Sequence, residues 1–216
     1  MGSLDRSSVV FCGVGHSMKS IFLSASIPVV GIGRYFETAD PFLIQVAVRE
    51  LMTLALGRRR VVWGGHPAIP PMIWAVCQDL GIRYADAVVL YQSRFFQEVF
   101  PDENAHFGNV VFVEAVGNER EPSLLAMRRA MLSRDDLDAA VFIGGMEGTL
   151  AEYEIFTHFH PSLKVIAVAS PGGAARELAL QIHKPSEEQV RSLDFAGMFW
   201  RELGINPNDR REGAVS

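Results

Sequence analysis

Short apolar segments alternate along the chain with segments whose apolar residues recur every three or four positions. The apolar segments cover residues 21–26, 60–65, 86–92, 110–116, 139–143 and 164–169. Several are nearly continuous apolar runs, which is typical of strands buried on both faces of a parallel sheet. The segments with helical spacing cover residues 40–57, 72–80, 122–133, 149–159 and 173–183. The pattern predicts a three-layer α/β fold with a mostly parallel central sheet.

The first predicted helix has clear boundaries and an apolar composition. Asp40 is a typical N-cap residue, Pro41 suits the first helical position, and Gly57 is a natural stop. The only charged residues inside are Arg49 and Glu50. A helix this apolar must be covered on most sides. We therefore expect a partner subunit as well as the sheet to cover it, which predicts a homo-oligomer, most simply a dimer.

The sequence contains no internal repeat and no convincing interdomain linker. We expect an N-terminal extension over residues 1–18 and one α/β domain over residues 19–185. Residues 186–216 are less regular, and we interpret them as a C-terminal helix through Trp200 followed by a polar tail.

Composition narrows the class of protein. The 216 residues are 49% hydrophobic and 21% charged, which excludes a disordered chain. The net charge of −5 argues against binding a long nucleic acid. Cys12 and Cys77 cannot build a disulfide framework, and no apolar run of about 18 residues or secretory signal is present. We expect a cytoplasmic protein that is not embedded in a membrane.

Small residues collect where the predicted strands end and the helices begin. These positions are Ser24, Ala25, Ser26, Gly64, Gly65, His66, Gly144, Gly145, Met146, Glu147, Gly148, Thr149, Gly172 and Gly173. Helix N-termini present unpaired N–H groups, and glycine lets a ligand approach the backbone. Tight strand-to-helix turns also need small residues for packing alone. Because these loops share one edge of the sheet, we favour a site for a phosphate or a phosphorylated sugar.

Common nucleotide and hydrolase motifs are missing. The chain has no GxxxxGK[ST], no GxGxxG after a strand and no GxSxG. These absences argue against a P-loop nucleotidase, a hydride-transfer dehydrogenase and an α/β-hydrolase. His158 and His160 lie two positions apart and would not share a helix face, so we expect no metal site and no cofactor.

The most specific segment is residues 127–154, which contains two adjacent arginines, a strand and a glycine loop. It resembles the signature of the LOG family of cytokinin-activating phosphoribohydrolases, an Arg-Lys pair followed by PGGxGTxxE. Matching residues are Arg128, Arg129, Gly144, Gly145, Gly148, Thr149 and Glu152. Ile143 replaces the proline, and one extra residue lengthens the loop at positions 146–147. The loop therefore differs from the family pattern, and LOG activity does not follow from it.

Three further segments widen the resemblance. Residues 22–28, 64–69 and 170–175 are similar to the SLOG superfamily, which unites LOG enzymes, DNA-processing protein A and sensor modules of bacterial nucleotide signalling and anti-phage systems. The chain is most similar to those bacterial modules. The resemblance implies a Rossmann-like domain that binds a nucleotide or a nucleotide-derived sugar at the glycine loops.

The resemblance assigns roles to a few side chains. Glu152 would contact ribose hydroxyls or assist departure of a base, although the helix dipole also favours acidic residues in a first turn. The Arg128 guanidinium would bind a phosphate through bidentate hydrogen bonds. Two further candidates come from their positions in loops and not from the resemblance: Arg34 for the phosphate, and His66 for the phosphate or the base, with plain surface or structural roles as the alternatives. Aromatic residues around a polar turn would stack a base or, more simply, form a satellite apolar cluster: Phe95, Phe96, Phe100 and Phe107.

Two functions follow. One is a signalling or defence-type module that binds an ADP-ribose-like ligand or a nucleoside monophosphate and acts through a separate effector protein. The alternative is a nucleotide N-glycosidase, or LOG-like phosphoribohydrolase, that uses Glu152 and Arg128. The sequence leaves open whether the chain is an enzyme. Binding of single-stranded DNA is a third reading, which the net charge and the lack of a basic run oppose.

Overall fold

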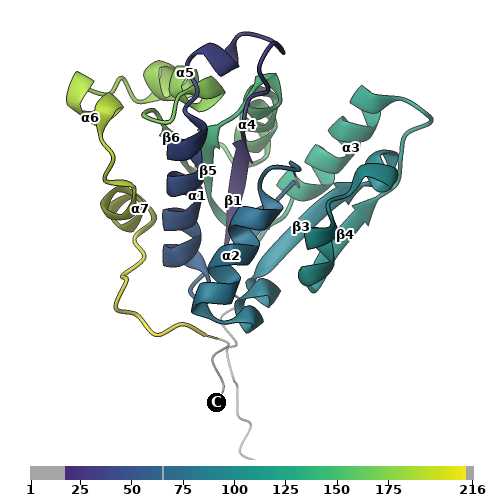
Figure 1. The fold of residues 1–216 in the computed structure, drawn as a ribbon, viewed down its shortest axis with the longest axis horizontal. Coiled ribbons are helices and arrows are strands. Elements are labelled where there is room, and N and C mark those ends of the chain that lie inside the picture. Colours follow the sequence, from purple (N-terminus) through teal and green to yellow (C-terminus); the bar gives the residue numbers. More distant parts are fainter. Residues whose placement is uncertain (1–17, 65, 213–216) are drawn as a thin grey trace, which may run out of the picture.

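A computed structural model describes residues 18–64 and 66–212 and contains a six-stranded sheet (Figure 1). The strands are β1 Ser20–Ser26, β2 Arg60–Trp63, β3 Val88–Ser93, β4 Asn109–Val113, β5 Leu137–Gly144 and β6 Lys164–Val168. They lie in the order β4-β3-β2-β1-β5-β6, and every neighbouring pair is parallel. The prediction of a mostly parallel sheet is confirmed.

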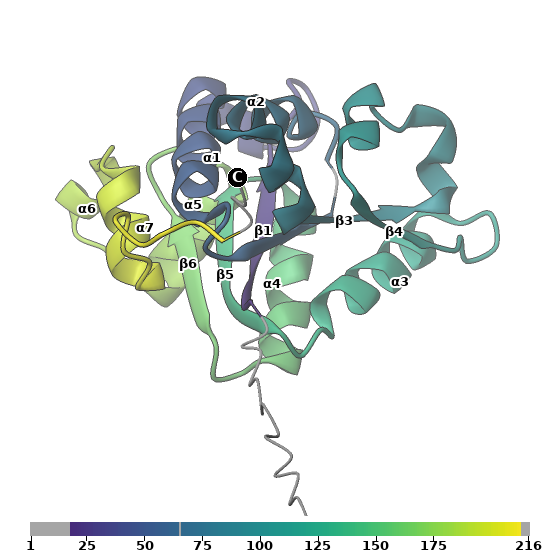
Figure 2. The ribbon, with the colours of Figure 1, turned by 90° about the horizontal axis from the view of Figure 1, so that it is seen from below.

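Helices cover both faces of the sheet and complete three layers (Figure 2). They are α1 Pro41–Ala55, α2 Pro70–Leu80, α3 Arg120–Leu132, α4 Glu147–Phe159, α5 Gly173–Ile182, α6 Glu187–Arg191 and α7 Phe195–Leu203. One core cluster joins the sheet to α1, α2 and α7, and the other joins it to α3, α4 and α5. The architecture is a Rossmann-like α/β fold.

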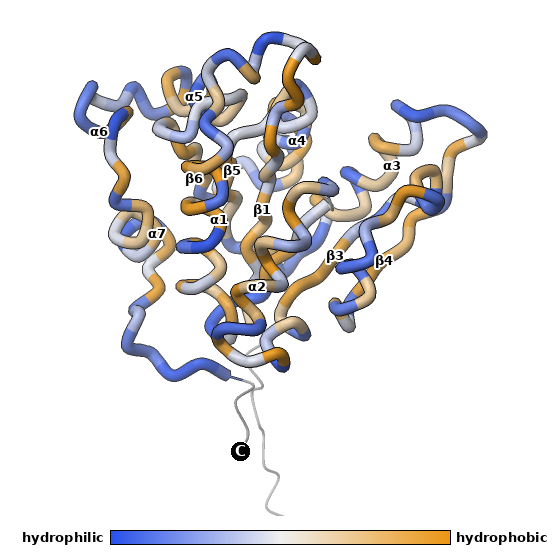
Figure 3. Tube along the Cα trace, viewed as in Figure 1, coloured by the Kyte–Doolittle hydropathy of each residue, from blue (hydrophilic) through white to orange (hydrophobic). Residues whose placement is uncertain are grey.

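Side chains of each central strand alternate between the two cores. In β1, Ile21 and Leu23 pack towards α1, and Phe22 packs towards α4. The Phe22 ring lies 5.9 Å from Phe142 and 6.2 Å from Phe156, measured between ring centroids. Because both faces are covered, the strands are apolar along much of their length, as the hydropathy of β3 shows clearly (Figure 3).

Helix α1 begins as predicted. The Asp40 side chain accepts hydrogen bonds from the backbone N–H groups of Phe42 and Leu43, at 2.9 and 3.1 Å. The helix ends at Ala55, and Gly57 follows with a φ of +77°. These contacts confirm the N-cap and place the end two residues before the glycine.

The chain itself supplies much of the cover for α1. Helix α7 packs along it, and Phe195 and Phe199 of α7 join the core that α1 shares with the sheet. The apolarity of α1 therefore has an explanation within one subunit. The homodimer stays a prediction, without the support that this helix was expected to give.

The C-terminal segment contains two short helices, α6 and α7, where one was expected. The residues after α7 return to α1: Ile205 is buried, and the Arg211 guanidinium donates to the carbonyl groups of Thr53, at 2.5 Å, and Leu56. Residues 195–212 are thus packed against the α/β domain. Among the described residues, no helix combines the length and apolarity needed to cross a membrane.

The strand order creates a crevice beside β1. From β1 the chain adds strands β2, β3 and β4 on one side, and then β5 and β6 on the other. Consequently α1, after β1, and α4, after β5, lie on opposite faces. In sheets of this kind, ligands bind at the carboxyl ends of the strands where the order reverses.

Candidate functional site

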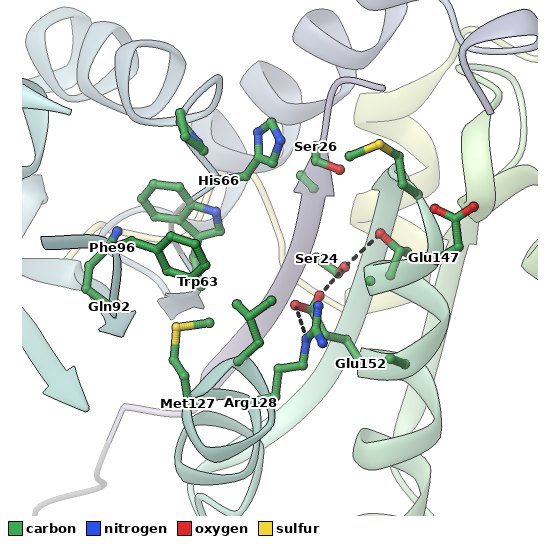
Figure 4. A pocket seen from close by; sticks show the side chains of 18 of the residues that line it. Ser24, Ser26, Trp63, His66, Gln92, Phe96, Met127, Arg128, Glu147 and Glu152 are labelled. Carbon is green, nitrogen blue, oxygen red and sulfur yellow. Dashed lines mark hydrogen bonds and ion pairs between the residues drawn. The ribbon is translucent and has the colours of Figure 1, made fainter. Parts of the chain in front are cut away.

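A cleft of about 660 Å³ lies at this crevice (Figure 4). Its walls come from the carboxyl ends of β1, β2 and β3, the start of α4, the segment 94–101 and one side of α3. Its volume falls within the range of sites that hold small molecules. The cleft therefore is the candidate binding site.

Most residues singled out in the sequence line this cleft. They are Ser24, Ala25, Ser26, Gly64, His66, Arg128, Met146, Glu147, Gly148, Thr149 and Glu152. Gly65 lies outside the described residues. The rest of the predicted set, Arg34, Gly144, Gly145, Gly172 and Gly173, do not line the cleft.

Arg34 has a partner elsewhere. Its guanidinium forms an ion pair with the Glu177 carboxylate of α5 at 2.6 Å, and its side chain is 68% exposed. It also lies over the Tyr35 ring. The alternative of a surface role therefore fits Arg34 better than a phosphate clamp.

Glycines of two loops hold the back of the cleft together. Gly145 donates its N–H to the Ser26 carbonyl at 2.9 Å, and its own carbonyl accepts from Ala174 at 3.0 Å. At Gly172, where φ is +77°, a Cβ atom would fall 1.8 Å from the Thr38 carbonyl oxygen. These glycines therefore allow close backbone packing, and the loop that contains Gly172 and Gly173 supports the wall without lining the cavity.

Glu152 and Arg128 form the polar centre of the site. Glu152 accepts a hydrogen bond from the Ser24 hydroxyl at 2.5 Å and faces Arg128 Nε at 3.4 Å. Ser24 also lies 3.4 Å from the Thr149 hydroxyl. The Arg128 and Glu152 side chains are only 14% and 16% exposed. A charged pair and two hydroxyls thus meet in a largely desolvated corner of the cleft.

Glu152 lies deeper in α4 than the sequence indicated. The helix begins at Glu147 and not at Thr149, so Glu152 belongs to its second turn. The helix dipole acts mainly on the first turn and does not explain a carboxylate there. The first-turn position belongs to Glu147, whose carboxylate lies beside Gly33 and points away from Glu152 (Figure 4).

The N-terminus of α4 is open to an anion. Met146 occupies the N-cap position, and no side chain of the described residues caps the helix there. A Cβ at Gly148 would fall 2.7 Å from an Arg128 terminal nitrogen, so the absence of a side chain lets the guanidinium lie against the helix start. Arg128 thus connects Glu152 with the electropositive end of a helix, where a phosphate would be stabilised by both.

The opposite end of the cleft is aromatic and apolar. Trp63 and Phe96 lie at this end (Figure 4), and Phe100 and Met127 also line the cleft. Phe107 is instead buried in the core, with its ring centroid 6.3 Å from that of Trp63. Of the phenylalanines considered in the sequence, Phe96 and Phe100 therefore form part of the cleft wall, and Phe107 belongs to the core.

Two further wall residues were missed in the sequence. Trp63 ends β2, Gln92 ends the third predicted strand one residue before the end of β3, and both line the cleft. Gln92 carried a usable signal, since it is a polar residue at the carboxyl end of an otherwise apolar strand. His66 lies nearby, and burial lowers the pKa of its imidazole, which favours the neutral form at neutral pH.

Burial raises the pKa of the Glu152 carboxyl above its ordinary value of 4.5, against the opposing influence of Arg128 and Ser24. A raised pKa in the folded state means that ionisation costs stability as pH rises. We expect the free energy of unfolding of the native protein to fall, relative to Glu152→Gln, as pH increases from about 4 to about 8. Urea unfolding across this range measures it.

Glu154→Gln is the matched control, because Glu154 is an exposed glutamate on the same helix. Its stability should follow that of the native protein at every pH. Equal pH dependence of all three proteins would show that Glu152 ionises as freely as a surface carboxyl.

Comparison with known proteins gives a family. A model of the SLOG cluster3 family matches residues 34–203. No curated protein sequence matches the chain. Among solved structures, a crystal structure titled TM1055, a structural genomics target, aligns with a TM-score of 0.49 and 16% identity, covering 85% of this chain and 99% of that one.

The family match spans well over half of the chain, including the strands and helices that build the cleft. Together with the Rossmann-like sheet, it supports a nucleotide-related function for this fold. The predicted resemblance of the chain to the SLOG superfamily is confirmed. This chain belongs to the SLOG cluster3 family.

Proposed function

We propose that the cleft binds a nucleotide or a nucleotide-derived sugar, such as a nucleoside monophosphate or an ADP-ribose-like ligand. The observation that carries this proposal is the position of Arg128, which lies between the buried Glu152 carboxylate and the uncapped start of α4. An anion that binds between a cation and the electropositive end of a helix is stabilised by both.

The phosphate would occupy the start of α4. Gly148 and Thr149 belong to the first turn of this helix and line the cleft. The phosphate oxygens would accept hydrogen bonds from backbone N–H groups there and from the Arg128 guanidinium. Such a site needs no cluster of positive side chains, which agrees with the acidic net charge of the chain.

The sugar would lie against Glu152. A carboxylate accepts hydrogen bonds from neighbouring hydroxyl groups, and Ser24 already fills one of its acceptor positions. Ribose hydroxyls would supply the remaining donors while Arg128 turns towards the phosphate. One ligand would thereby satisfy both members of the charged pair.

We favour a binding module over an enzyme because the glycine loop departs from the LOG pattern. Ile143 stands in place of the proline, and the loop carries one extra residue. A module of this kind would act in signalling or defence through a separate effector protein.

Calorimetric titration tests the proposal. We expect the native protein to bind adenosine monophosphate or ADP-ribose saturably, with one ligand per chain. Ribose 5-phosphate should bind more weakly at the same site, and adenosine, which lacks the phosphate, should bind weakest. Equal affinity for adenosine and its monophosphate would contradict a phosphate site at α4.

Hydrolysis of the N-glycosidic bond is the second candidate, and the burial of Glu152 favours it. A carboxylate held beside the anomeric carbon stabilises the positive charge that develops as the base leaves. Chromatography of nucleotides incubated with the protein would detect free base. Release by the native protein, and its loss in Glu152→Gln, would establish the enzyme; recovery of intact nucleotide would support the binding module.

A further inference from the structure

Gln92 is a buried amide without a partner. It lies near the carboxyl end of β3 and is only 5% exposed, and its Nε2 group has no hydrogen-bond partner among residues 18–64 and 66–212. Buried polar groups in folded proteins are nearly always hydrogen-bonded, because a buried donor without a partner loses its hydrogen bonds to water and gains none within the protein. An unpaired buried donor in a cleft wall is therefore a position that can bind a hydrogen-bond acceptor of a ligand.

The surroundings of Gln92 suit a flat, apolar ring. Trp63 and Phe96 lie beside Gln92 in the cleft (Figure 4), and Phe100 and Met127 also line the cleft. Figure 4 shows Gln92, Phe96 and Trp63 grouped on the far side of the cavity from Glu152. Aromatic faces stack readily on nucleobases, and methionine adapts to a ring edge.

The two sides of the cleft differ in chemistry, as the two ends of a nucleotide do. Arg128, Glu152 and Ser24 lie together beside α4, and the aromatic side with Gln92 lies opposite (Figure 4). A nucleoside monophosphate likewise carries its phosphate and its base on either side of the ribose. A phosphate at α4 would therefore direct the base towards Gln92.

We propose that Gln92 determines base specificity by donating a hydrogen bond to the edge of a purine base; this inference rests on the nucleotide site proposed above. A glutamine amide pairs well with a purine, whose N7 is an acceptor beside the group at position 6. The larger purine ring also covers more of the aromatic wall than a pyrimidine does. Gln92 is thus a binding residue for the base, as Arg128 is for the phosphate.

Gln92→Met separates this role from a structural one. Methionine has a similar length and no polar group to leave unpaired, so the thermal midpoint of the unliganded variant should equal or exceed that of the native protein. Gln45→Met is the matched control, since Gln45 is an exposed glutamine on α1. Gln92→Leu repeats the test if Gln92→Met does not fold.

The experiment is a calorimetric titration of each protein with adenosine, guanosine and cytidine monophosphates and with ribose 5-phosphate. In the native protein, the purine nucleotides should bind more tightly than cytidine monophosphate and ribose 5-phosphate. Gln92→Met should weaken purine nucleotide binding by about 10-fold or more and leave ribose 5-phosphate unchanged. Gln45→Met should behave as the native protein.

Different failures have different meanings. Equal losses for all four ligands in Gln92→Met, unchanged purine affinity, or equal native affinity for purine and pyrimidine nucleotides would each overturn the role of Gln92 alone. A native protein that binds ribose 5-phosphate as tightly as any nucleotide would do the same. No binding of any of the four ligands to the native protein would overturn both this inference and the proposed nucleotide site.

Discussion

Replacing Arg128 with methionine should weaken the binding of a nucleoside monophosphate by about 10- to 100-fold, which is the range for losing a hydrogen bond to a charged group. Arg128 is the cation that lies against the start of α4, where we place the phosphate. Methionine preserves part of the apolar stem and removes the charge. The affinity is measured by calorimetry with adenosine monophosphate.

The same substitution should also destabilise the unliganded protein. The Glu152 side chain, which is 16% exposed in the native protein, would keep its hydrogen bond from Ser24 but lose its ion pair with Arg128. Breaking a buried ion pair costs more than the pair contributes, and for this partly exposed pair we expect a loss of about 2–3 kcal/mol in the free energy of unfolding at neutral pH. Adding Glu152→Gln to Arg128→Met should restore most of the stability and none of the binding.

Arg129→Met is the control for both effects. Arg129 is the neighbouring arginine on α3 and is exposed, so its loss should alter neither affinity nor stability appreciably. If Arg128→Met and Arg129→Met bound the nucleotide equally well, Arg128 would have no part in the phosphate site.

Phe199→Ala should lower the free energy of unfolding by about 3–5 kcal/mol, the usual loss for truncating a fully buried aromatic side chain. Phe199 is 0% exposed and lies in the core that α7 shares with α1 and the sheet. The substitution would leave a cavity between the C-terminal segment and the domain. Urea unfolding measures the change.

Trp200→Ala provides the comparison, because the adjacent Trp200 is 51% exposed. We expect it to cost less than about 1 kcal/mol. Similar losses for the two variants would contradict the packing of α7 against α1 and would reopen the case for a partner subunit covering that helix.

Local features of the fold were predictable because their causes are local. The capping of α1 by Asp40 depends on a side chain two or three residues from the groups it binds. The parallel sheet was predictable because nearly continuous apolar runs are typical of strands that are covered on both faces. Conversely, the cover of α1 by the C-terminal segment joins residues far apart in the chain, such as Thr53 and Arg211, which are 158 positions apart, and no periodicity of the sequence predicts it.

The candidate site was predictable where residues follow strand ends. Ser24 lies near the carboxyl end of β1, whereas Arg128 and Glu152 lie on α3 and α4 and were identified by the resemblance to the LOG signature; the three side chains meet in the cleft. Arg34 does not line the cleft, because its guanidinium forms an ion pair with Glu177 of α5. Gly172 does not line it either, and its close approach to Thr38 is a packing contact. Both facts depend on how distant loops pack, which the order of residues does not reveal.

A crystal structure of the native protein soaked with adenosine monophosphate would locate each part of the nucleotide. We expect the phosphate at the start of α4 within hydrogen-bonding distance of Arg128, the ribose beside Glu152, and the base against Trp63 and Gln92. A nucleotide bound in any other orientation, or outside this cleft, would contradict this placement.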